Sequence, residues 1–268
     1  MDGQKNKYIV YHIEKGVARL TFNRPEVHNA FHADLINEAC EAVRQAKEDP
    51  SVRVLVITGA GKSFCAGADL NWMREIIHYS FEQNLEESLK IAEVMHSIYS
   101  LPKPVVAMVN GAAIGGGTGF VAACDIAVAA EEAVFSLSEV KIGLVPAAIS
   151  PYVIRKIGER NAREYFLTGK RIPALQAREI GLVNTVVSRE ELEQSVEDIV
   201  RRLLSSGPEA IAKCKELIQR VPGMDWEEVK DFTARMIAGL RISEEGQEGM
   251  AAFLKKRKPS WIKDSGEK

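Results

Sequence analysis

The chain has 268 residues, of which 46% are hydrophobic and 27% charged, as in a folded globular protein rather than a disordered one. Its 35 lysines and arginines nearly balance its 37 aspartates and glutamates, so no net charge favours binding to nucleic acid or to a membrane surface. Residues 1–7 are polar, and no segment reaches the roughly 20 apolar residues that span a bilayer. We therefore expect neither a secretory signal nor a membrane helix.

The spacing of cysteine and histidine argues against a metal site and against a disulfide framework. The four cysteines lie far apart, and the five histidines form no cluster with the spacing of metal ligands. Reduced thiols are the ordinary state in the cytoplasm, so we expect a cytoplasmic protein that binds no metal.

Strand and helix signals alternate along the first part of the chain. Residues 35–46 carry apolar side chains at helical spacing, and residues 14–16 separate two apolar runs as the turn of a hairpin does. Five apolar runs predict strands: residues 9–13, 17–22, 54–58, 105–109 and 126–130. This alternation is typical of an α/β fold with mainly parallel strands.

Helical patterns dominate the end of the chain. Beyond Pro146 the strand signal fades, apart from a short run at residues 182–187. Four segments predict helices: residues 192–204, 209–218, 226–240 and 243–256. We therefore expect an α/β core over residues 1–190 and a helical carboxyl-terminal region over residues 191–268, of a kind that packs against other subunits.

Two glycine-rich segments, residues 63–70 and 110–120, each follow a predicted buried strand. Small residues let a ligand approach backbone N–H groups, and the second segment leads into a probable helix start, where negative charge is favoured. Close packing of a helix on a strand is the alternative reading of three consecutive glycines. No dinucleotide-binding pattern follows the first strand, and no Gly-Lys-Ser/Thr phosphate loop is present.

Together these segments resemble the crotonase (enoyl-CoA hydratase/isomerase) superfamily. Further motifs agree in order and spacing over about residues 8–261: residues 23–26 with 29–30, 102–107, 124–126, 167–169, 177–183 and 248–254. The resemblance implies a crotonase-type ββα superhelical core with a helical carboxyl-terminal oligomerisation region. It also implies an acyl-CoA substrate, no separate cofactor because CoA is part of that substrate, and a homotrimer or a hexamer built as a dimer of trimers.

In that superfamily two backbone N–H groups hold the thioester carbonyl oxygen, and the matching positions here are Ala68 and Gly116. Preorganised donors of this kind stabilise the negative charge that develops on the oxygen during reaction. The resemblance also assigns CoA contacts to the segment around Ala68 and phosphate contacts to a lysine of the carboxyl-terminal helix. The matching residues are Ala66, Gly67, Asp69, Leu70 and Lys256.

Hydratases of the superfamily normally use two glutamates, and this chain keeps one of them. Glu139 matches the second, whereas Gly119 stands where the first is expected. A carboxylate beside an acyl chain is desolvated, which raises its pKa toward the range of a useful general acid or base. Ala147 takes the position whose N–H holds the reacting water in family hydratases.

Residues 69–73 and 141–152 resemble a bacterial branch that includes methylglutaconyl-CoA and carboxygeranoyl-CoA hydratases. From this resemblance we expect Trp72 and Met73 to line the acyl pocket. An aromatic residue in a helix is also a common core residue. The main prediction is an enoyl-CoA hydratase, with methylglutaconyl-CoA as one candidate substrate. A 3-enoyl to 2-enoyl-CoA isomerase with a single glutamate is the enzymatic alternative, and a non-catalytic acyl-CoA-binding scaffold is the other.

Overall fold

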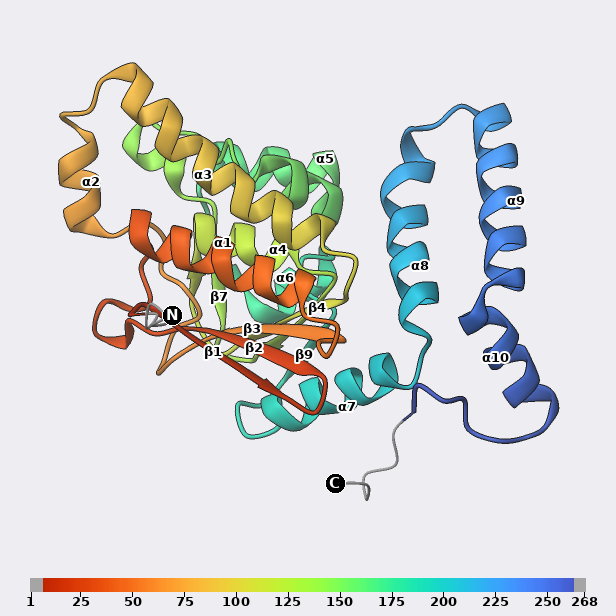
Figure 1. The fold of residues 1–268 in the computed structure, drawn as a ribbon. Helices are drawn as coiled ribbons and strands as arrows, with labels where there is room; N and C mark the ends of the chain where they lie inside the picture. Colours follow the sequence, from red (N-terminus) through yellow and green to blue (C-terminus); the bar gives the residue numbers. More distant parts are fainter. Residues whose placement is uncertain (1–6, 263–268) are drawn as a thin grey trace. The chain divides into compact units, whose positions relative to one another are not determined.

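The computed structural model describes residues 7–262. The chain divides into two compact units (Figure 1). The first comprises residues up to Leu101 together with Val105–Glu197, and the second comprises Pro102–Pro104 and the chain from Asp198 onward. The boundary falls inside helix α7 (Leu192–Leu204).

A six-stranded sheet forms the centre of the first unit. In sheet order the strands are β1 (Ile9–Glu14), β2 (Val17–Phe22), β3 (Val54–Gly59), β4 (Val105–Val109), β6 (Ile126–Ala130) and β9 (Thr185–Val187). Strands β1 and β2 form an antiparallel hairpin, and every later pairing is parallel. Every residue of β3 and β4 is buried, as expected for central parallel strands covered on both faces. The predicted hairpin and parallel core strands are therefore confirmed.

Helices cover this sheet. Figure 1 shows on one side of it α1 (Ala33–Glu48), α3 (Phe81–Ser100), α4 (Gly116–Ala123) and α5 (Ser150–Thr168). Two shorter helices, α2 (Leu70–Ile76) and α6 (Ala174–Glu179), complete the unit. The sequence patterns predict α1, but they miss α3 and α5, which are the longest helices of this unit.

A small second sheet positions the functional segments. It consists of β5 (Ala113–Ile114), β7 (Val134–Ser136) and β8 (Ile172–Pro173), in that order. Two short 3-10 helices are also present: η1 (Pro25–Val27) precedes α1, and η2 (Glu139–Ile142) follows β7. Strand β5 runs parallel to β7, with Ile114 opposite Ser136, so the chain that enters α4 lies beside the chain that enters η2.

The second unit is helical. Its elements are α8 (Pro208–Arg220), η3 (Val221–Gly223), α9 (Trp226–Ile242) and α10 (Glu244–Leu254). The predicted helices are present, although the last one ends at Leu254 and not at Lys256. Among residues 7–262, no helix has the length and apolar character needed to cross a bilayer.

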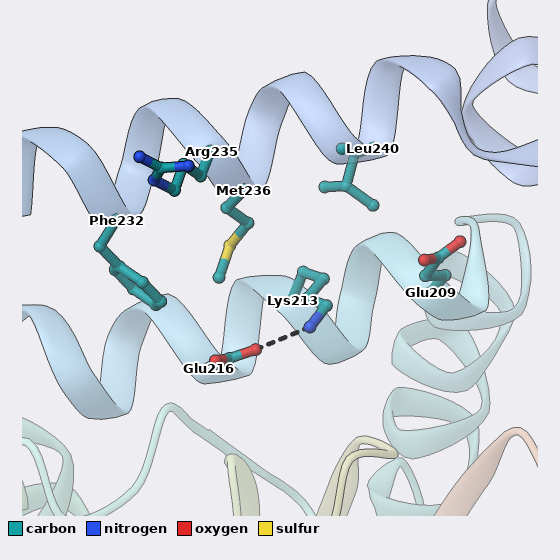
Figure 2. A pocket seen from close by; sticks show the side chains of 8 residues that line it. Glu209, Lys213, Glu216, Phe232, Arg235, Met236 and Leu240 are labelled. Carbon is teal, nitrogen blue, oxygen red and sulfur yellow. Dashed lines mark hydrogen bonds and ion pairs between the residues drawn. The ribbon is translucent and has the colours of Figure 1, made fainter.

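A pocket of about 330 Å³ lies between α8 and α9 (Figure 2). Helix α8 contributes the Lys213–Glu216 ion pair, whose charged atoms are 2.9 Å apart, and α9 contributes Phe232 and Met236. None of the site residues suggested by the sequence lines this pocket. The candidate site lies elsewhere, in the first unit.

Candidate acyl-CoA site

Hydrogen bonds hold the two glycine-rich segments side by side. Cys65 and Ala113 form a parallel bridge, in which the Ile114 N–H donates to the Cys65 carbonyl over 2.9 Å. The Phe64 and Cys65 N–H groups both donate to the Ala112 carbonyl over 3.0 Å. Ala68 and Gly116 each lie three residues beyond this bridge, on adjacent chain segments.

Glycine is required where these segments meet. A β-carbon added to Gly117 would lie 2.1 Å from the Cys65 carbonyl oxygen, a distance that only a backbone shift relieves. Gly67 has a φ of 95°, which residues with side chains rarely adopt, and a β-carbon added there would lie 3.2 Å from the Ile114 carbonyl oxygen. The glycines thus allow the two backbones to approach closely.

The Ala68 N–H points away from the segment that supports it. The Gly67 carbonyl accepts a hydrogen bond from the Phe31 N–H over 2.8 Å, and the Asp69 N–H donates to the Phe31 carbonyl over 2.8 Å. Because a trans peptide places its C=O and N–H on opposite sides, the Ala68 N–H faces away from Phe31. Within the described chain this N–H donates to no other group, so it remains available to a ligand.

The Gly116 N–H is the first donor of helix α4. Gly115 caps this helix, and its carbonyl accepts from the Gly119 N–H over 3.1 Å. By the same peptide geometry the Gly116 N–H points out of the helix end, where the first N–H groups of a helix have no intrahelical partner. No described residue accepts a hydrogen bond from it. The helix dipole adds to its preference for negative charge.

The Glu139 carboxyl group lies against this helix start. The Gly115 N–H donates to the Ser136 carbonyl over 2.8 Å, which brings η2 beside α4. A β-carbon added to Gly115 would lie 3.0 Å from Glu139 Oε1. Oε2 is buried and has no hydrogen-bond partner among residues 7–262. Burial raises the pKa of Glu139 above its usual 4.5, the direction that suits a carboxyl group acting as a general acid or base near neutral pH.

Gly119 leaves no room for a second carboxylate. A β-carbon at this position would lie 2.1 Å from Ile149 Cγ2 and 3.4 Å from Met95 Cε. Ile149 is 3% exposed and belongs to the hydrophobic core. The space beside Gly119 is therefore filled with apolar atoms.

Ala147 does not present a free N–H group. Its N–H donates to the Val145 carbonyl over 2.8 Å, so holding a water there would require this bond to be shared or broken. The sequence predicts that the Ala147 N–H binds water, but in the structure the Val145 carbonyl already accepts a hydrogen bond from this N–H.

The Asp69 carboxylate is committed to the protein. Asp69 Oδ2 lies 2.7 Å from Arg24 Nη2, and Oδ1 accepts from the Asn71 N–H over 2.7 Å at the start of α2. Burial alone would raise the pKa of Asp69, but Arg24 and the N–H donors outweigh burial and lower it. Asp69 thus holds its segment through its side chain, whereas Leu70 is 69% exposed and Ala66 is half-buried.

Two aromatic residues flank the donors. The ring centroids of Trp72 and Phe31 are 5.9 Å apart, and Trp72 Nε1 is buried with no hydrogen-bond partner in the part of the chain described. A β-carbon on Gly116 would lie 2.6 Å from Phe31 Cε1. Trp72 is among the residues predicted from the sequence and Phe31 is not, because no local pattern reveals that residues 31 and 116 touch.

Cys65 and Lys256 differ in exposure. The Cys65 thiol is fully buried, and burial raises its pKa to about 12, so it stays protonated.

Lys256 belongs to the second unit, two residues after α10 ends, where it is exposed and has a φ of 53°. Across residues 7–262, no group of three or more His, Cys, Asp or Glu side chains could hold a metal ion.

Comparison with known proteins gives a consistent result. The family model described as enoyl-CoA hydratase/isomerase matches residues 12–264. Crotonyl-CoA hydratase of Syntrophomonas wolfei subsp. wolfei is 36% identical over 256 residues, 95% of this chain and 97% of that protein. A trans-2-decenoyl-acyl-carrier-protein isomerase of Streptococcus mutans serotype c is 32% identical, with 95% and 98% covered.

A solved structure extends the agreement to three dimensions. The crystal structure of an enoyl-CoA hydratase from Shewanella pealeana has a TM-score of 0.93 and 40% identity, with 96% of this chain and 97% of that chain covered. The fold is the crotonase fold predicted from the sequence, with a helical carboxyl-terminal region. The chain therefore belongs to the enoyl-CoA hydratase/isomerase family of enzymes.

Proposed function

We propose that the protein is an enoyl-CoA hydratase in which Glu139 carries the proton transfers and the Ala68 and Gly116 N–H groups stabilise the thioester enolate. One observation carries this proposal: a buried carboxyl group with a raised pKa lies against the residue that precedes an uncommitted, outward-pointing N–H. A base next to an oxyanion-stabilising pair is the arrangement that chemistry beside a thioester requires.

Each step of the hydration balances with one carboxylate. Glu139 takes a proton from water as the water oxygen bonds to C3, and the electron pair of the double bond moves onto the thioester oxygen. The two N–H groups stabilise that oxyanion. The electron pair then returns as C2 takes the proton from Glu139. The carboxylate is regenerated, and the product is a 3-hydroxyacyl-CoA.

Isomerisation of a 3-enoyl-CoA to a 2-enoyl-CoA is a second candidate, favoured by two observations. Ile149 fills the space that a second carboxylate at position 119 would need, and the Ala147 N–H donates a hydrogen bond to the Val145 carbonyl. Both features reduce the means of holding a water. In this reaction Glu139 removes a proton from C2 and returns it to C4, which needs one carboxylate and no water. A relative named as an isomerase adds support.

The acyl group is proposed on narrower grounds. Residues 69–73 and 141–152 resemble the branch that includes methylglutaconyl-CoA hydratases, so we propose methylglutaconyl-CoA as a substrate to compare with crotonyl-CoA. The buried Trp72 Nε1, which lacks a partner in the described chain, supports an acyl group with a hydrogen-bond acceptor.

The test follows the absorbance of the conjugated thioester with crotonyl-CoA, methylglutaconyl-CoA and a 3-enoyl-CoA, with Glu139→Gln as the control. Loss of conjugation from a 2-enoyl substrate, abolished by Glu139→Gln, supports the hydratase. Gain of conjugation from the 3-enoyl substrate alone identifies the isomerase. Acyl-CoA binding without any turnover identifies a non-catalytic scaffold.

We also propose that the protein assembles as a trimer or as a hexamer. Large apolar side chains of the second unit are exposed, as is typical of a surface that another protein covers: Trp226, Ile242, Phe253 and Leu254. The molar mass measured by light scattering tests this proposal, and a molar mass equal to that of a single chain contradicts it. Lys256, exposed in the same unit, is a proposed contact for CoA phosphates.

A further inference from the structure

We propose that Phe31 is a positioning residue that sets the separation of the two N–H donors; the inference rests on the proposed role of Ala68 and Gly116. Phe31 contacts the backbone on both sides of Ala68 and also lies against Gly116 itself. Its backbone brackets Ala68 by two hydrogen bonds, and its ring lies over Gly116.

The ring contact with Gly116 is close and specific. The three nearest atoms to a β-carbon built on Gly116 all belong to the Phe31 ring, and the two nearest are Cε1 at 2.6 Å and Cζ at 2.8 Å. The φ of Gly116 is not positive, so its backbone conformation is open to alanine. A side chain at residue 116 would therefore collide with the Phe31 ring.

Neighbouring aromatic residues hold the ring in place. Phe31 is 5% exposed, with its centroid 5.9 Å from that of Trp72 and 6.3 Å from that of Phe120. Edge-to-face pairs of this kind have a preferred geometry. Since α4 begins at Gly116, the ring acts as a spacer between the start of α4 and the backbone of Ala68. A smaller side chain would let the two donors shift relative to each other.

The main test compares Phe31→Leu and Phe31→Ala with the matched control Phe22→Leu. Phe22 is as buried as Phe31 and also packs on Phe120, but its aromatic contacts run to Phe64 and Phe120 and not to Trp72. A displacement near 1 Å can lower a rate about 100-fold. We expect kcat to fall by about that factor in Phe31→Ala and less in Phe31→Leu. KM should change little, and the control should keep the wild-type kcat.

A second readout does not depend on turnover. The carbonyl stretch of bound butyryl-CoA, measured by infrared difference spectroscopy, should move to lower frequency in the wild type and in Phe22→Leu because both donors polarise the carbonyl. In Phe31→Leu the shift should be smaller. A folded Phe31 variant that shows a smaller carbonyl shift has an altered donor geometry. If Phe31 only stabilised the fold, the carbonyl shift of the folded variant would equal that of the wild type.

Combining variants tests the spacer directly. Gly116→Ala should be nearly inactive because the new methyl group meets the ring, and Gly116→Ala with Phe31→Ala should be more active than the two single effects multiplied together predict.

The outcomes separate this inference from the proposed function. If the wild type turns over an enoyl-CoA but the Phe31 variants resemble Phe22→Leu in kcat and carbonyl shift, the spacer role is wrong and the proposed function stands. If no enoyl-CoA is turned over but the shift is present and depends on Phe31, the spacer role stands and the proposed function fails. A wild type with no carbonyl shift overturns both.

Discussion

Ile149 and Gly119 share one space: the Ile149 Cγ2 atom lies 2.1 Å from the point where a β-carbon of residue 119 would be. The apolar side chain and the missing side chain are therefore complementary. By the family resemblance a glutamate is expected at position 119. The Gly119–Ile149 pair therefore marks the main departure of this chain from the two-glutamate pattern of the hydratases.

Substitution of Gly119 should be costly because Ile149 already fills the space of a side chain at position 119. We expect Gly119→Ala to lower the free energy of unfolding by about 2 kcal/mol, because it overpacks a filled core. Ile149→Ala is itself destabilising because Ile149 is a core residue, but combined with Gly119→Ala it should cost less than the two single losses added together. Thermal or urea unfolding measures the effect. Gly239→Ala is the matched control, because Gly239 also lies inside a helix and a β-carbon there meets nothing within 4 Å. Equal losses at the two glycines would contradict the overlap.

The rate should depend on the ionisation of Glu139. To act as the proposed base this carboxylate must be ionised, and burial raises its pKa above the usual 4.5. We expect kcat/KM to rise with pH through an apparent pKa above that of an exposed glutamate. A pH profile with crotonyl-CoA measures it. A rate that is flat down to pH 4.5 would show that another group is the base.

The same carboxyl group should reduce stability at neutral pH. Since the folded protein binds the Glu139 proton more tightly than the unfolded chain does, stability falls as the pH rises from the ordinary glutamate pKa through the raised one. We expect Glu139→Gln to raise Tm at neutral pH and to lose this advantage in acid. Glu131→Gln, at an exposed position, serves as the control. A lower Tm for Glu139→Gln at pH 7 is the contrary result.

The Arg24–Asp69 pair should matter more than an exposed pair. Its side chains are 13% and 6% exposed, so Asp69→Asn leaves Arg24 without its buried counter-charge and should destabilise the protein by about 3 kcal/mol. Glu159→Gln breaks the exposed pair with Arg163 and should cost less than about 0.5 kcal/mol. Urea unfolding of both variants decides. Similar losses would mean that the Asp69 pair is no more than a surface contact.

Much of the core was predictable because the signals are local. Central parallel strands such as β3 and β4 are continuous apolar runs, and the Glu14-Lys15-Gly16 turn marks the hairpin. Helix α3 was missed because its first half exposes apolar side chains such as Phe81 and Leu89, which obscures the usual amphipathic pattern. Its capping box at Ser80 and Gln83 was a usable signal.

The sequence suggests the candidate site residues but not their contacts. The glycine-rich segments stand out as motifs and Glu139 comes from the family resemblance, and the structure brings Glu139 beside Gly115. The filling of the Gly119 space by Ile149, the hydrogen bond of the Ala147 N–H and the contact of Phe31 with Gly116 depend on segments far apart in the sequence or on local backbone geometry. No periodicity or spacing reports such contacts.

The buried thiol of Cys65 bears on the chemical selectivity of the enzyme. A thiolate near an acyl-CoA would capture the acyl group by thioester exchange, which would end turnover. Burial raises the pKa of Cys65 to about 12, so Cys65 remains a neutral thiol at physiological pH. A thiol is a poor nucleophile compared with its thiolate. Burial thus lets a cysteine lie three residues before the proposed oxyanion donor Ala68 without presenting a thiolate to a thioester bound there.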